Sequence, residues 1–125
     1  MSAIEALRKA AETLRMRAQR ATQGDWSAEC LGSEGYRVFG PRGNGSTARE
    51  RRRPTVATVT FGDFETCKAD SLYIAAMHPG IGLRLADLLD SVASDLNAFE
   101  TTDEDAERTD PEALELARHI LGEAS

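Results

Sequence analysis

Residues 69–99, ADSLYIAAMHPGIGLRLADLLDSVASDLNAF, form the longest apolar and periodic stretch of this sequence. Proline suits the first turn of a helix, whereas the residue before a proline disfavours helical geometry. The stretch therefore predicts two helices that meet at His78-Pro79, the first of them capped by Asp70. In the second helix, Ala86, Leu89 and Ala93 would widen a main apolar face with helical spacing: Ile81, Leu85, Leu88, Val92, Leu96 and Phe99.

The segments before this stretch predict a helix and then a sheet. Ser2 and Glu5 form a capping box, and Gly24 suits the backbone turn that follows the helix. The seam of this helix is narrow and rich in alanine: Ile4, Leu7, Ala11, Leu14 and Ala18. Three short segments of β-branched and aromatic residues then predict an antiparallel meander, with glycine-rich turns between them: 26–31, 36–39 and 56–61.

The last quarter of the chain predicts an acidic linker, 100–109, and a final helix. Asp110-Pro111-Glu112 begins that helix, and Gly122 ends it. We therefore expect an α+β fold with an N-terminal helix, a three-stranded antiparallel sheet, a helix pair packed on the sheet and a C-terminal helix. Residues 1–99 would form a single domain, and residues 100–125 would belong to it or to an oligomer contact.

Two expectations about packing follow from these faces. The helices offer more apolar surface than one small sheet can cover, which predicts a homodimer through helices. Trp26 anchors the first strand in this interpretation, with stacking on a ligand as its alternative, and Tyr73 and Ile74 face the sheet. The side chains that we expect to be largely buried are Trp26, Tyr73, Leu85, Leu88 and Val92.

Composition limits the compartment and the class of partner. The 125 residues suffice for one domain that folds without disulfides or metal. Two cysteines, no secretory segment before the first helix and no run of membrane-spanning length predict a cytoplasmic protein that does not contact a membrane. Residues 1–60 carry 11 Lys or Arg and 6 Asp or Glu, whereas residues 61–125 carry 4 and 15. The net charge of −6 argues against general coating of nucleic acid.

No pattern in the sequence predicts an enzyme, a cofactor or a metal. His78, His119, Cys30 and Cys67 lack the spacing of metal ligands. His78 precedes a helix, where an imidazole can cap a backbone amide, and nothing places a nucleophile beside it. The glycines at 80 and 82 lack the remaining glycines and the lysine of a phosphate loop.

The loop 42–53, RGNGSTARERRR, is the main candidate for binding, and we call it the arginine loop. Its length exceeds what a hairpin needs, and arginine favours bidentate partners such as carboxylate and phosphate. The plainer alternative is a solvated loop without a partner. A nucleic acid is a third alternative, although the loop has no aromatic residue to stack on a base. The candidate partner-binding residues are Arg42, Arg49, Arg51, Arg52 and Arg53.

Three short segments in fixed order resemble a known family: TQGDW at 22–26, ADSLYIAA at 69–76, and His78-Pro79 before the leucine-rich 81–89. Their order is similar to that in the ead-like early-region proteins of temperate phages and their relatives in actinobacterial phages and prophages. The resemblance covers roughly residues 5–90, with His78 where the family commonly has asparagine and Ser71 where it has alanine. It implies a small accessory protein of a mobile element and supplies no catalytic residues.

We therefore expect a non-enzymatic phage or prophage accessory protein that binds a host or phage protein, for example as a modulator of a host protein. The alternative is a nucleic-acid-binding regulator that uses the arginine loop.

Overall fold

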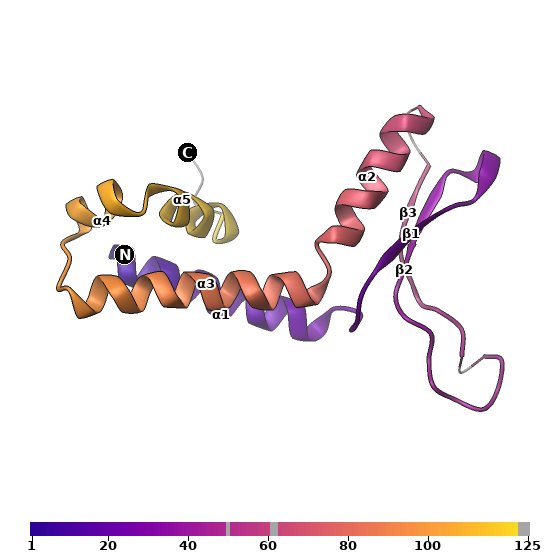
Figure 1. Cartoon of the computed structure of the whole chain (residues 1–125), viewed down its shortest axis with the longest axis horizontal. Helices are drawn as coiled ribbons and strands as arrows, with labels where there is room; N and C mark the ends of the chain where they lie inside the picture. The colour runs from indigo at the N-terminus through magenta and orange to yellow at the C-terminus, as the bar shows by residue number, and fades with distance from the viewer. Residues whose placement is uncertain (50, 61–62, 123–125) are drawn as a thin grey trace. The chain divides into compact units, whose positions relative to one another are not determined.

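The computed structural model of the chain describes residues 1–49, 51–60 and 63–122, and it confirms the α+β fold (Figure 1). The chain divides into two compact units. We call Met1–Arg17 with Gly82–Ser125 the helical unit, and Ala18–Ile81 the sheet unit. The elements in chain order are α1 (Ala3–Arg20), β1 (Ser27–Cys30), the 3-10 helix η1 (Gly32–Glu34), β2 (Tyr36–Phe39), β3 (Thr55–Val59), α2 (Phe64–Ala76), α3 (Pro79–Ala98), α4 (Asp103–Thr109) and α5 (Pro111–Ile120).

In the sheet unit, three antiparallel strands in the order β1-β2-β3 confirm the predicted meander. Alternation along β2 buries Tyr36 and Val38 on one face, and α2 lies along the sheet (Figure 1). The ring of Tyr36 lies 5.3 Å from that of Phe64, at the start of α2. The predicted end of the third strand at residue 61 lies outside the described residues.

The structure corrects the expected start and orientation of α2. The cap is Asp63, whose carboxylate accepts a hydrogen bond from the Thr66 amide at 2.8 Å. Asp70, the expected cap, is an exposed residue within the helix. Tyr73 is 70% exposed, so the expectation that it faces the sheet was wrong. Small residues instead form the buried face of this helix, which allows a close approach to the strands: Cys67, Ser71 and Ala75.

Trp26, which we expected to be largely buried, is partly buried. Its indole N–H donates to the carbonyl of Thr22 at 2.8 Å. This bond fastens the ring to the segment after α1, so the anchoring acts through a polar contact as well as through packing.

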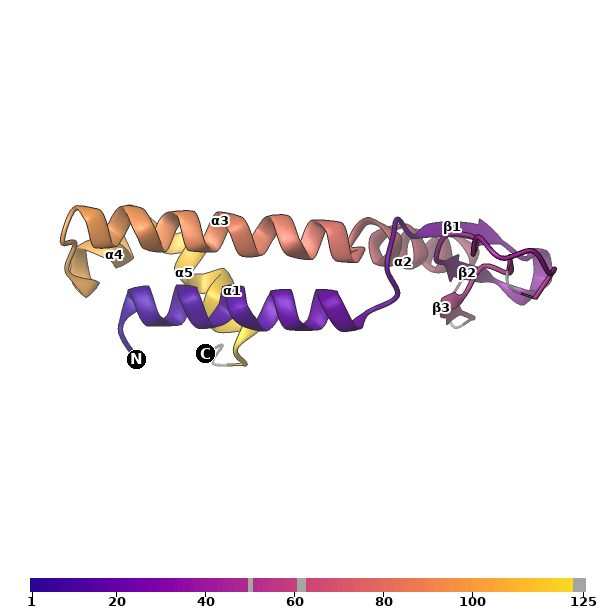
Figure 2. The ribbon, with the colours of Figure 1, turned by 90° about the horizontal axis from the view of Figure 1, so that it is seen from below.

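In the helical unit, α1 and α3 lie side by side and run in opposite directions (Figures 1 and 2). The Glu5 amide donates to the Ser2 hydroxyl at 3.2 Å, which confirms the expected cap of α1. Pro79 begins α3 as predicted. The buried core joins four helices and contains many alanines: Ala3, Leu7, Ala10, Ala11, Ala86, Leu89, Ala93, Leu96, Ala106, Leu114 and Ala117. Of the two helices that we expected on the sheet, α2 is there, whereas the core residues of α3 pack with α1, α4 and α5.

The buried face of α3 is rotated by one residue from the predicted one. Leu89 is fully buried and Leu88 is 56% exposed, so the expected burial of Leu88 was wrong. Leu85 and Val92, also expected in the core, are partly buried beside this face. The reason is the alanine seam of α1: a close helix pair needs small residues at its contact, and Ala86 and Ala93 supply them.

The expected acidic linker contains a helix. Thr102 caps α4 by accepting a hydrogen bond from the Asp105 amide at 3.2 Å, and Ala106 is buried in the core. The final helix α5 follows the prediction, with Leu114 and Ala117 buried and Gly122 at a φ of 76°. In the part of the chain that the structure describes, no helix combines the length and the apolar character that a bilayer crossing requires.

Candidate functional site

The arginine loop is closed at its base by the sheet. The Gly40 amide donates to the Pro54 carbonyl at 2.9 Å, which joins the end of β2 to the start of β3. Within the loop, the Arg51 amide donates to the Thr47 carbonyl at 3.1 Å, and the Arg51 guanidinium donates to the Ser46 carbonyl at 3.0 Å. These bonds make a compact turn that carries Arg51 and Arg52.

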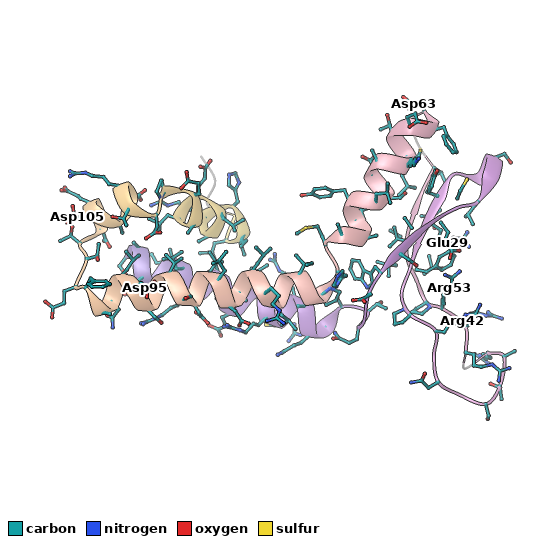
Figure 3. The ribbon with its side chains drawn as sticks, in the orientation of Figure 1. Glu29, Arg42, Arg53, Asp63, Asp95 and Asp105 are labelled. Carbon is teal, nitrogen blue, oxygen red and sulfur yellow. The ribbon has the colours of Figure 1, made fainter. Side chains whose placement is uncertain are left out.

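Arg53 fixes the end of this loop on the open face of the sheet. Its two terminal nitrogens donate to the two carboxylate oxygens of Glu29 on β1, at 2.5 Å and 2.7 Å (Figure 3). Its guanidinium carbon lies 4.3 Å from the ring centroid of Phe39, and that of Arg37 lies 5.9 Å from the same centroid. Arg53 therefore makes both contacts that a planar guanidinium favours, a bidentate carboxylate and an aromatic face.

The alternation of β2 explains why these groups meet. Tyr36 and Val38 face α2, so Arg37 and Phe39 point to the opposite face of the sheet. Glu29 is the direct register partner of Arg37, and the antiparallel pairing brings it to that same open face.

Four arginines, Arg53 among them, line one cavity of about 430 Å³. Three of them, Arg42, Arg51 and Arg52, are exposed. The loop itself is described except at residue 50; among the described residues no ion pair joins these three to a carboxylate. The full lining is Arg42, Ala48, Arg51, Arg52 and Arg53.

The arginines around Glu29 favour the ionised form of its carboxyl group. The hydrogen bonds from Arg53 lower the pKa of the Glu29 carboxyl, and the positive charges of Arg53 and then Arg42 lower it further. The carboxylate of Glu29 in turn raises the pKa of Arg53. Glu29 is thus ionised at neutral pH and neutralises Arg53, which leaves the charges of Arg42, Arg51 and Arg52 directed at the cavity.

The structure brings together four of the five arginines that the sequence singled out, and Arg49 is not part of the lining. It also adds Glu29, Arg37 and Phe39, which the sequence interpretation missed. The alternation of β2 was a usable signal for Arg37 and Phe39. Placing Glu29 on this face requires the register of the β1–β2 hairpin, which the sequence alone leaves open.

The remaining candidate residues are His78 and the two cysteines. His78 accepts a hydrogen bond from the Gly80 amide through Nδ1 at 3.2 Å, as a cap of α3. Cys30 is exposed and Cys67 is buried, and in the described chain no disulfide joins them. Among the residues that the structure describes, no group of three or more His, Cys, Asp or Glu could hold a metal ion.

Comparisons with protein-family models, with curated proteins and with solved structures find no match to this chain. The similarity to ead-like phage proteins therefore stays a prediction from the short segments that carry it.

Proposed function

We propose that this chain is a non-enzymatic accessory protein of a phage or prophage that acts by binding another protein, and that the arginine loop binds a carboxylate-rich patch on a host or phage partner. The observation that supports it most is the cavity lined by Arg42, Arg51, Arg52 and Arg53. Like charges repel, so gathering them has a cost that an acidic partner would offset. Arginine is also enriched among the residues that dominate binding energy at protein interfaces.

A protein partner suits this site better than a nucleic acid. Among the described residues, the aromatic ring at the site is that of Phe39, which already has Arg53 over it, so that guanidinium takes the place of a stacked base. The chain as a whole carries a net charge of −6, which opposes approach to a polyanion. A folded protein with a local acidic patch meets less of this repulsion.

The test uses a fluorescein-labelled peptide with two adjacent glutamates between neutral residues as a probe of binding to a local carboxylate patch. Arg42→Gln with Arg52→Gln removes two cavity charges without touching the Arg53–Glu29 pair or the Arg51–Ser46 bond. The matched control, Arg17→Gln with Arg20→Gln, removes two exposed charges from α1. We expect the cavity variant to weaken peptide binding about tenfold, and the control to change it little.

Nucleic acid serves as the competing probe in the same assay at low salt. No shift of single- or double-stranded DNA should occur if the partner is a protein. Tighter binding of DNA than of the glutamate peptide, with a steep loss as salt rises, would favour the nucleic-acid regulator. No binding of either probe at low salt would remove the proposal.

We also propose that the protein is cytoplasmic, because a sequence with only two cysteines suits a reducing compartment.

A further inference from the structure

A second surface, a groove between α3 and α5 in the helical unit, is unrelated to the arginine loop. Its volume is about 290 Å³. Leu88, Leu89 and Val92 form the wall on α3, and Ala113 and Leu116 form the wall on α5. Two charged residues complete the lining at the start of α5: Asp110 and Glu112.

The apolar part of this groove is open to solvent. Leu88 is 56% exposed, and Val92, Ala113 and Leu116 are only partly buried. Leu89 beneath them is fully buried and belongs to the core. The groove therefore has an apolar floor continuous with the core and a leucine at its edge that a partner could cover.

The rim and its surroundings are acidic. Residues 103–122 carry seven Asp or Glu and two Arg. Both arginines already have acidic neighbours within this segment, Arg108 at 3.9 Å from Asp105 and Arg118 on Glu107. Asp110 makes no side-chain cap to α5, so its carboxylate is available at the rim. On the Leu88 face of α3, Arg84 one turn before is balanced by Asp95 two turns after.

We propose that this groove binds an amphipathic helix of another protein, with apolar residues on one face and Lys or Arg beside them. Two helices that line an apolar groove match the way in which such a helix docks, through anchors at helical spacing. The acidic rim selects basic flanks.

A second copy of this chain fits the groove less well. In a two-fold contact the same patch meets itself, so the acidic rim of one copy would lie against the acidic rim of the other. The chain's own basic helix, α1, already buries its alanine seam in the core. The occupant is therefore a foreign helix of opposite charge.

The probe is a labelled peptide of about 18 residues, long enough to form a helix, with leucines at every third or fourth position and lysines between them. A control peptide has the same composition with the leucines spread around the helix. The protein variant is Leu88→Ser, and the matched control is Phe99→Ser, which removes another exposed apolar side chain from the end of α3.

We expect the amphipathic peptide to bind in fluorescence anisotropy, with a loss of about tenfold for Leu88→Ser and little change for Phe99→Ser. Asp110→Asn with Glu112→Gln should weaken binding several-fold and flatten its salt dependence, since it removes the rim charges. This pair leaves the apolar wall intact, so it tests the site even if Leu88→Ser perturbs α3.

Four results would overturn the proposal: no binding of the amphipathic peptide, equal binding of the control peptide, equal effects of Leu88→Ser and Phe99→Ser, or a dimer in light scattering that Leu88→Ser converts to a monomer. The last result would identify the occupant as a second copy.

Discussion

Arg53 and Glu29 are 24 residues apart in the sequence, and each terminal nitrogen of the arginine donates to a different carboxylate oxygen of the glutamate. The pair joins the end of the arginine loop to β1, with Phe39 beneath the guanidinium. It fixes one wall of the cavity, and among the described residues the other arginines of its lining form no ion pair with a carboxylate.

The first prediction concerns the titration of Glu29. Since Arg53 lowers the pKa of this carboxyl in the folded state, the stability contributed by the pair is complete above the ordinary pKa of glutamate. It is lost as the pH falls through the lowered value. A carboxyl NMR titration should place Glu29 below an ordinary glutamate, and Arg53→Gln should raise it toward the ordinary value. An ordinary pKa for Glu29 in the unmodified protein would show that the pair does not persist in solution.

The second prediction separates two adjacent leucines of α3. Leu89→Ala removes a fully buried side chain and should cost about 2–5 kcal/mol of unfolding free energy. Leu88→Ala, which we expected from the sequence to be costly, should change it by less than about 1 kcal/mol because Leu88 is 56% exposed. Urea unfolding followed by far-UV circular dichroism measures both. The reverse order of costs would restore the helix phase that the sequence suggested.

That pair of residues shows where sequence patterns stop being sufficient. The stretch 69–99 contains two overlapping apolar stripes, one through Leu88 and one through Leu89. Pattern alone favours the stripe with the larger residues. The choice between them depends on the alanine seam of α1, a contact between distant parts of the chain, which makes a close approach possible.

Boundaries set by local chemistry were easier to predict. Pro79 begins α3 and His78 caps it because both effects involve neighbouring residues. The start of α2 was missed although Asp63 is a good cap, since no regular apolar period follows it. In α4, Ala106 is the one apolar residue among seven, and its burial depends on the helices around it.

For the candidate site, the sequence identified the arginines but not which of them pairs with a carboxylate of the same chain. Arg53 differs from Arg42 and Arg52 only through Glu29 and Phe39, which the folded sheet brings to it. Composition cannot distinguish an arginine that holds a loop from one that lines a cavity.

The third prediction tests whether residues 103–109 form a helix in solution. Thr102→Ala removes the hydroxyl that caps the Asp105 amide, and should cost about 0.5–2 kcal/mol. Thr101→Ala removes a neighbouring hydroxyl that does not cap α4, and serves as the control. Equal, negligible effects in thermal unfolding would mean that the segment is the linker that we first expected.

The fourth prediction is self-association, which the sequence suggested. Three large apolar side chains are exposed, Leu72 and Tyr73 on α2 and Met77 directly after it, which leaves apolar area for a second copy to cover. Light scattering at high concentration should then give twice the mass of the 125-residue chain, and Tyr73→Ser should shift it toward one mass. A single mass throughout the concentration range would remove the homodimer.

The last prediction compares two glycines of the β1–β2 connection. Gly32 and Gly35 have φ angles of 70° and 90°, where other residues are strained by about 1–3 kcal/mol, and the ψ of −140° at Gly35 is particularly unfavourable for them. A Cβ at Gly32 would meet no atom within 4 Å, so Gly32→Ala should cost little more than this strain. A Cβ at Gly35 would overlap the carbonyl oxygen of Val59, a backbone atom of β3 that cannot move without disturbing the sheet. Gly35→Ala should therefore destabilise the sheet unit more than Gly32→Ala.

Urea unfolding followed by the fluorescence of Trp26, the one tryptophan of the chain, measures the difference in that unit. Equal costs for the two variants would mean that β3 does not approach Gly35 as closely as this pairing requires.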